Sequence, residues 1–97
     1  MYEEGEGVAK STIDAAKYYR KAADQDHLEA QCNLAIAYAK GAGVPKDLVQ
    51  AYAWWSVARI KPEARQDLEA AKKQMSPEQI ASGEKLGAEL AAKIRKQ

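Results

Sequence analysis

The 97-residue chain contains no phenylalanine, one cysteine and three prolines. A single cysteine, Cys32, excludes an internal disulfide framework. Apolar runs are broken well before the ~20 residues that a membrane span needs, and no signal-peptide core follows Met1. With 15 basic and 14 acidic side chains, the chain also lacks the strong net charge that attracts nucleic acid or an anionic membrane. We therefore expect a soluble chain whose partner is a protein.

Hydrophobic residues make up 46% of the chain, and alanine supplies much of that fraction. This fraction is too high for a disordered segment, and the length suits one small domain. Because alanine is small and favours helices, we expect a thin core between closely packed helices.

A near repeat organises the chain. The segment YAKGAGV at residues 38–44 resembles YEEGEGV at residues 2–8, which gives a period of 36 residues. Such a period is typical of a solenoid of helix pairs. One glycine of each copy can adopt the left-handed conformation that closes a helix, and the other lets the backbone pass close to a neighbouring helix. The sequence thus predicts the same turn twice, with residues 1–4 ending a helix whose body is missing.

Helical spacing of apolar residues predicts helices over about 11–24, 28–40 and 47–59. The first of these would begin at Ser11 as the capping residue. We define the first and third as B helices and the second as an A helix, by analogy with the two positions of a helix-pair repeat. The apolar stripes of the B helices match in the 36-residue register, with Ala15, Tyr18, Tyr19 and Ala22 equivalent to Ala51, Trp54, Trp55 and Ala58.

Two further helices are predicted near the C-terminus. Pro62 suits the first turn of a third A helix, and Ser76 followed by Pro77 and Gln79 forms a strong helix-start signal with a capping box. The final helix has one apolar face and one charged face. We expect it to fold back over the third A helix as a terminal cap. Its predicted apolar face consists of Ile80, Gly83, Leu86 or Gly87, Leu90 and Ile94.

The segments 14–25 (DAAKYYRKAADQ) and 30–34 (AQCNL), together with Tyr38, Gly41, Gly43 and Asp47, resemble the Sel1-like repeat, a relative of the tetratricopeptide repeat. The segment 64–80 also resembles the closing helices of bacterial members. The resemblance implies an all-α, antiparallel helix-pair solenoid. It implies repeats over residues 1–60, the first one truncated, and a closing helix pair over residues 61–97. Ala35 and Asp26 stand where the family usually has glycine, and both replacements are compatible with the fold.

Three residue groups suggest chemistry, and each has a simpler structural explanation. The Gly-Ala-Gly turn at 41–43 lacks the strand and further glycines of a phosphate-binding loop. Asp24, Asp26, His27 and Glu29 could hold a divalent cation, but solvated helix ends explain them better. Cys32 has no acid–base relay around it. We therefore expect no enzyme activity, no cofactor and no metal site.

The adjacent tryptophans, Trp54 and Trp55, point about 100° apart on a helix, so at most one faces a given surface. We assign Trp55 to the core with Leu34. Truncation of Trp54 is accordingly expected to be the milder change.

The resemblance implies a scaffold that binds a protein or peptide on the concave face lined by its A helices. The alternative is a structural C-terminal cap of a longer repeat protein, without a ligand of its own. On the A helix 28–40, the expected contact residues lie opposite the packing stripe, although Ile36 could instead pack on the next A helix. The residues of this expected site are Glu29, Cys32, Asn33, Ile36 and Lys40.

A second expected interface lies at the N-terminal edge, where Ala15, Tyr18, Tyr19 and Ala22 lack most of the covering A helix. An uncovered apolar face of a repeat marks an interface. A missing part of the chain, a foreign amphipathic helix or a second copy could cover it, and we favour the second copy. Family resemblance favours the bacterial envelope as the location, but the sequence leaves periplasm and cytoplasm open.

Overall fold

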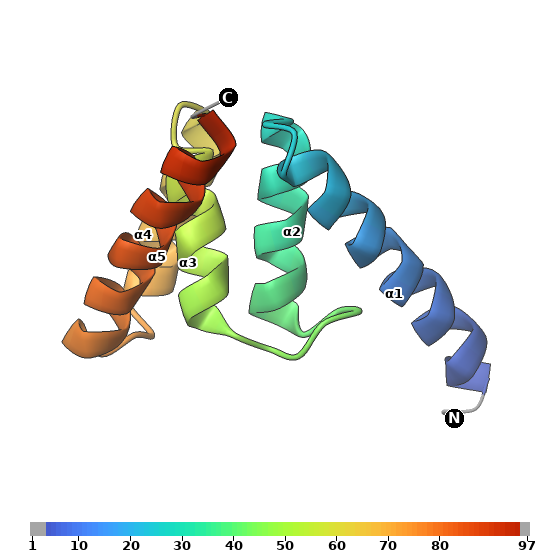
Figure 1. The fold of residues 1–97 in the computed structure, drawn as a ribbon. Helices are drawn as coiled ribbons and strands as arrows, with labels where there is room; N and C mark the ends of the chain where they lie inside the picture. The colour runs from blue at the N-terminus through green and yellow to red at the C-terminus, as the bar shows by residue number, and fades with distance from the viewer. Residues whose placement is uncertain (1–3, 96–97) are drawn as a thin grey trace.

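The computed structural model describes the backbone of residues 4–95 and the side chains of residues 11–95. These residues form five helices and no strand, which confirms the all-α, solenoid-like fold. Figure 1 shows the helices in chain order, α1 (Glu4–Ala23), α2 (Leu28–Lys40), α3 (Leu48–Val57), α4 (Pro62–Lys72) and α5 (Pro77–Arg95). The bounds of α2 agree with the predicted helix over 28–40.

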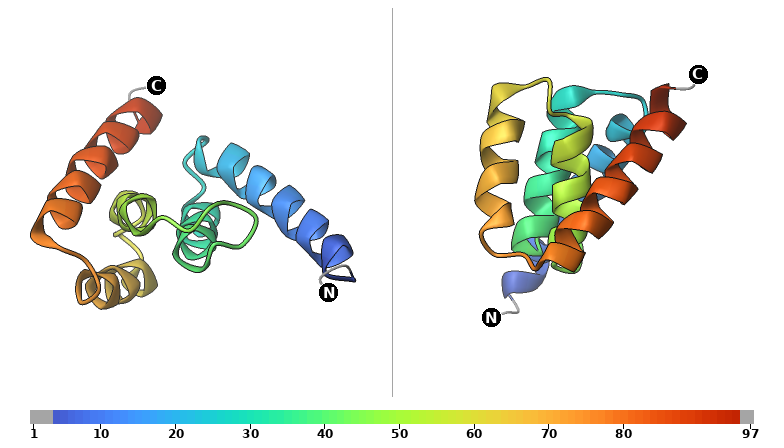
Figure 2. Two further views of the ribbon diagram at one scale, coloured as in Figure 1. Left: turned by 90° about the horizontal axis from the view of Figure 1, so that it is seen from below. Right: turned by 90° about the vertical axis from the view of Figure 1, so that its left-hand side faces the viewer.

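Helix α3 occupies the centre of the molecule. It packs against α2, α4 and α5, while α1 packs against the outer side of α2. The views in Figure 2 show α4 and α5 on two sides of α3, with α1 at the opposite end of the array. The predicted fold of the final helix over α4 is therefore wrong, because α5 packs chiefly on α3.

The first predicted turn is also absent. The backbone of α1 is helical from Glu4 onward, so the segment 5–8 and the expected cap at Ser11 lie inside this helix. The two copies differ at one decisive position, where Pro45 of the second copy corresponds to Ala9 of the first. Proline blocks helix continuation, whereas alanine favours it. The glycine turn is thus repeated in the sequence but not in the local structure.

The second turn has the predicted geometry. Gly41 closes α2 in the left-handed conformation with φ of 72°, and its N–H donates to the carbonyl of Ala37. Gly43 has φ of 81°, and a Cβ atom there would clash with the backbone of Thr12 and lie 3.1 Å from Cβ of Ala16. The turn between α2 and α3 therefore packs directly on α1.

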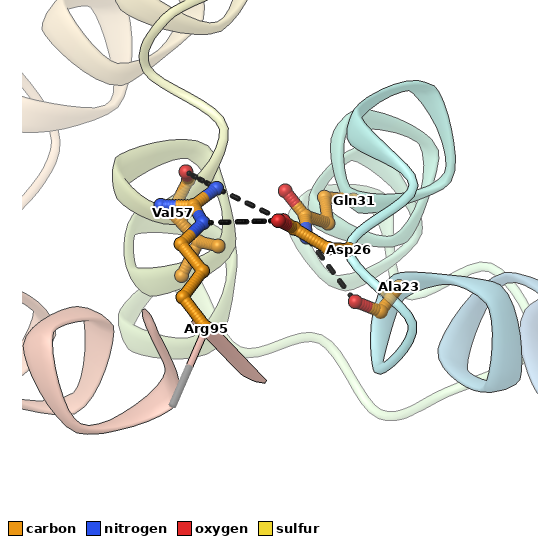
Figure 3. Close-up of polar contacts among 5 residues, drawn as sticks. All are labelled: Ala23, Asp26, Gln31, Val57 and Arg95. Carbon is orange, nitrogen blue, oxygen red and sulfur yellow. Dashed lines mark hydrogen bonds and ion pairs between the residues drawn. The ribbon is translucent and has the colours of Figure 1, made fainter. Parts of the chain in front are cut away.

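The α1–α2 turn is fixed by a polar cluster that the sequence did not predict (Figure 3). Asp26 has φ of 66°, which fits the glycine-like position expected from the family resemblance. The fully buried amide of Gln31 donates to the Ala23 carbonyl and to Asp26, each at 3.1 Å. Arg95 donates to Asp26 at 3.0 Å and to the Val57 carbonyl at 2.9 Å. The end of α5 is thereby attached to both repeats.

Both tryptophans are buried, with exposed fractions of 0% for Trp54 and 5% for Trp55. Burial therefore does not support the expected ranking, in which Trp54→Ala is the milder change. The reason is that α3 has neighbours on every side. Arg20 of α1 lies over the Trp54 ring, with its guanidinium carbon 5.7 Å from the ring centre.

The start of α5 follows the predicted capping box. The Ser76 N–H donates to Oε1 of Gln79 at 2.8 Å, and the Gln79 N–H donates to Oγ of Ser76 at 3.1 Å. On the predicted apolar face, Gly83, Gly87 and Ile94 are buried, and the other residues are partly buried. The two glycines bring α5 close to Tyr52 and Ser56 of α3.

We predict that Gly83→Ala destabilises the fold. A Cβ atom there would lie 2.7 Å from Cδ1 of Tyr52, a side chain that is only 3% exposed. Overpacking of this kind costs about 1–3 kcal/mol, and the higher helix propensity of alanine offsets up to ~1 kcal/mol of this loss. Urea unfolding should show the loss, while Ser82→Ala on the exposed side of α5 should not. An unchanged or raised midpoint for Gly83→Ala would contradict the close α3–α5 contact.

We predict that Trp54→Ala costs about 3–5 kcal/mol in the free energy of unfolding and no less than Trp55→Ala, because it opens a cavity at the centre of the molecule. The matched control is Tyr18→Ala at the equivalent position of α1, where Tyr18 is 67% exposed. This control should change stability by less than ~0.5 kcal/mol in dilute solution. A smaller loss for Trp54→Ala than for Trp55→Ala would restore the expectation from the sequence.

Candidate protein-binding grooves

A groove of about 560 Å³ lies between α1 and α2, and we refer to it as the N-terminal groove. Its walls are one face of α1 and one face of α2, and the turn after α2 contributes Ala42 at one end. Most of the lining side chains are apolar or small. The lining residues are Ser11, Thr12, Ala15, Ala16, Tyr19, Asn33, Ile36, Ala37, Lys40 and Ala42.

The two sets of residues predicted from the sequence meet in this groove. Asn33, Ile36 and Lys40 come from the expected A-helix site, and Ala15 and Tyr19 come from the expected N-terminal edge. Ile36 is partly buried and not fully enclosed, so part of its side chain faces the groove. Residues from two separately predicted sites thus lie on one surface.

The remaining predicted residues lie elsewhere. Glu29 is exposed but does not line the groove. Cys32 is only 9% exposed and belongs to the core, where burial raises the pKa of its thiol. Tyr18 is exposed on the outer side of α1, with its ring edge-on to Tyr19 and the two ring centres 6.2 Å apart. Ala22 is partly buried beyond the groove.

Equivalent positions of the two copies differ sharply in exposure. Trp54 is 0% exposed, whereas its equivalent Tyr18 is 67% exposed. Trp55 is buried, whereas Tyr19 is only partly buried. The same holds for the equivalent alanines, since Ala51 and Ala58 are fully buried while Ala15 and Ala22 are partly exposed. Within residues 11–95, no helix covers α1 in the way that α2 and α4 cover α3.

A larger groove of about 1120 Å³ lies between α4 and α5, with α3 as its floor, and we refer to it as the C-terminal groove. The sequence analysis did not identify it. Its only signal is the run of small residues on α5, Gly87, Ala88 and Ala91, which leaves space beside α3. The space exists because α5 packs on α3 and not on α4.

The polar side chains of the C-terminal groove are largely engaged in contacts within the chain. The Tyr52 hydroxyl donates to Glu84 at 3.1 Å, and burial together with this carboxylate raises the pKa of Tyr52 to about 12. Arg65 donates to the Arg59 carbonyl at 2.7 Å, in the turn that follows α3. Lys72 forms an ion pair with Glu69 at 3.5 Å. These contacts support the fold and do not assemble a reactive group.

The cation site considered at the α1–α2 turn does not form among residues 11–95. Asp24 pairs with Arg20 at 3.6 Å, and Asp26 pairs with Arg95. No group of three or more histidine, cysteine or carboxylate side chains in the described part of the chain is arranged to hold a metal ion. None of the helices within 4–95 is both long and apolar enough to cross a membrane.

Comparison with protein families gives a match that agrees with this geometry. The Sel1 repeat model matches residues 1–27 and 28–58, which together exceed half of the chain. The chain belongs to the Sel1 repeat family. Its second Sel1 match spans α2, the glycine turn and α3, and the division between the matches falls at the α1–α2 turn. A search of curated proteins found no match. Sel1 repeats are non-enzymatic and generally mediate protein–protein interaction.

We predict that the contact between Asp26 and Arg95 makes stability depend on pH. The Arg95 guanidinium lowers the pKa of Asp26 below its ordinary value. A lowered pKa in the folded state contributes stability above the unfolded pKa of ~3.9, and this contribution is lost as the pH falls through the folded value. The difference in unfolding free energy between wild type and Asp26→Asn should therefore shrink as the pH is lowered from 6 to 2.5.

Asn is the suitable replacement at position 26 because it tolerates positive φ. Arg95→Gln should reduce the same pH dependence from the other side of the contact. If the difference between wild type and Asp26→Asn stays constant with pH in urea titrations, the ion pair contributes nothing to stability.

Proposed function

We propose that this Sel1 chain is a scaffold that binds a protein or peptide partner in the N-terminal groove. The observation that carries the proposal is that Asn33, Ile36 and Lys40 of α2 lie in one groove with Ala15 and Tyr19 of α1. Grooves that bind peptides combine an apolar floor with a few polar groups that fix register and direction. The N-terminal groove has both components.

The apolar part consists of Ile36, Tyr19 and the neighbouring alanines. The alanine side chains have little bulk, so an occupant can approach the backbones of both helices closely at these positions. Ile36 is the proposed anchor contact, because it is the largest aliphatic side chain in the lining. Burial of its remaining exposed surface, at ~25 cal/mol per Å², favours an apolar residue of the partner at this point.

Polar recognition is assigned to Asn33 and Lys40. Neither side chain forms a hydrogen bond or ion pair with a described residue. The Asn33 amide can donate and accept, and Lys40, in the last turn of α2, supplies a positive charge. The groove therefore favours a partner segment that has an acidic or carbonyl group near the Lys40 end.

An amphipathic helix is the proposed form of this segment. In the second repeat, the positions equivalent to Ala15 and Tyr19 are Ala51 and Trp55. Neighbouring helices bury Ala51 completely and Trp55 almost completely. A helix in the N-terminal groove would reproduce that arrangement around α1. The 13 residues of α2 indicate the length of helix that this kind of surface accommodates.

Residues 61–97, which contain α4 and α5, are proposed to close the array without contacting this partner. This assignment keeps the division predicted at residue 60. The alternative function is a structural C-terminal cap with no ligand of its own. The contact of α5 with α3 favours a closing role for this segment but is compatible with either function.

The proposal predicts that a photo-crosslinker at position 33 captures a partner protein in cells, whereas the same group at the exposed Lys85 of α5 does not. With the captured partner purified, Ile36→Glu should weaken binding at least about 30-fold, because it places a charge at the apolar anchor. The matched control is Ile60→Glu, since Ile60 is 72% exposed and lies outside the N-terminal groove.

Equal affinity of wild type and Ile36→Glu for the captured partner would contradict binding in this groove. No specific capture at position 33, with a folded variant by circular dichroism, would favour the structural cap instead.

A further inference from the structure

The outer face of α1 carries a stripe of three exposed residues, Asp14, Tyr18 and Lys21, at steps of four and three. Such steps place the side chains on one side of a helix. Tyr18 is 67% exposed, although its repeat equivalent Trp54 is buried beneath the Arg20 guanidinium. The position that forms a helix–helix contact in the second repeat is thus uncovered in the first repeat.

The two charges on this stripe are unused within the described chain. Neither Asp14 nor Lys21 forms an ion pair or hydrogen bond with another described residue. They stand on opposite sides of Tyr18, four residues before it and three residues after it. At 1.5 Å rise per residue, their distances from Tyr18 along the helix axis are about 6 and 4.5 Å.

We propose that α1 pairs with α1 of a second copy of this chain, in antiparallel orientation about a twofold axis beside Tyr18. The axis brings the two Tyr18 rings together. Because the offsets along the helix are nearly equal, Asp14 of each copy then faces Lys21 of the other. The stripe is therefore complementary in charge to the same stripe of a second, antiparallel copy. A surface that binds an unrelated partner does not need this self-complementarity.

Aromatic contact between the two tyrosines supplies the apolar part of this interface. Lys17, at the edge of the stripe, is long enough to keep its ammonium group in water. Exposed ion pairs contribute little individually, so the dimer is weak and forms at high protein concentration. The N-terminal groove lies on a different side of α1, since adjacent residues such as Tyr18 and Tyr19 point ~100° apart. The dimer can therefore form while a partner occupies the N-terminal groove.

Sedimentation equilibrium over about 10–500 μM protein at low ionic strength tests the proposal. The apparent mass should rise from 10.6 kDa towards twice that value. Asp14→Lys and Lys21→Asp should each weaken association at least about tenfold, because each creates two like-charge contacts across the twofold axis. The double variant Asp14→Lys/Lys21→Asp should restore it, since the charges are then exchanged and complementary again.

Lys85→Asp on α5 makes the same charge change as Lys21→Asp and should leave association unchanged. All these positions are exposed, so circular dichroism should show equal helix content. A wild type that remains monomeric throughout overturns the proposal. So does a dimer that is insensitive to the single charge changes or is not restored in the double variant. None of these results affects the proposal of partner binding in the N-terminal groove, which Ile36→Glu tests separately.

Discussion

The burial of α3 is the constraint on which the rest of the structure depends. This ten-residue helix has a tryptophan pair in its sequence, and three other helices must pack around it to remove both rings from water. The apolar area of two tryptophans is a large share of the driving force available to a chain without phenylalanine. Small residues on the surrounding helices, such as Ala35, Ala64 and Gly87, allow the backbones to approach closely enough to enclose them.

The same requirement explains where the molecule is open. A repeat buries its surface only against its neighbours, so each end of an array exposes positions that are buried in the middle. At the α1 end, Tyr18 and Tyr19 occupy positions where α3 has buried tryptophans. The N-terminal groove and the outer stripe of α1 are two sides of this uncovered helix. Our proposals for a partner helix and for a second copy both follow from this difference in burial.

Polar contacts, as well as packing, attach the end of α5 to the α1–α2 turn. Arg95 reaches from the end of α5 to Asp26 and to the Val57 carbonyl, and Gln31 connects Asp26 to the end of α1. Residues 69 positions apart therefore hold the α1–α2 turn and the C-terminal ends of α3 and α5 in one cluster. The Nε2 group of the buried Gln31 amide donates both of its hydrogen bonds in this cluster, whereas its buried Oε1 has no partner among the described residues.

Local signals in the sequence determined the helices after residue 24, the left-handed Gly41, the close approach at Gly43 and the capping box of α5. The helices, the conformation of Gly41 and the capping box depend on the preferences of a few consecutive residues. The contact at Gly43 also needs α1 beside it. The sequence also identified five of the ten lining residues of the N-terminal groove. Only the tertiary structure decided that α5 packs on α3, that both tryptophans are enclosed, and that Cys32 faces the core. It also brought Arg95 to Asp26. These outcomes depend on which faces of the helices pack together. Helical periodicity defines the apolar face of a helix, but it does not specify which other helix packs on that face.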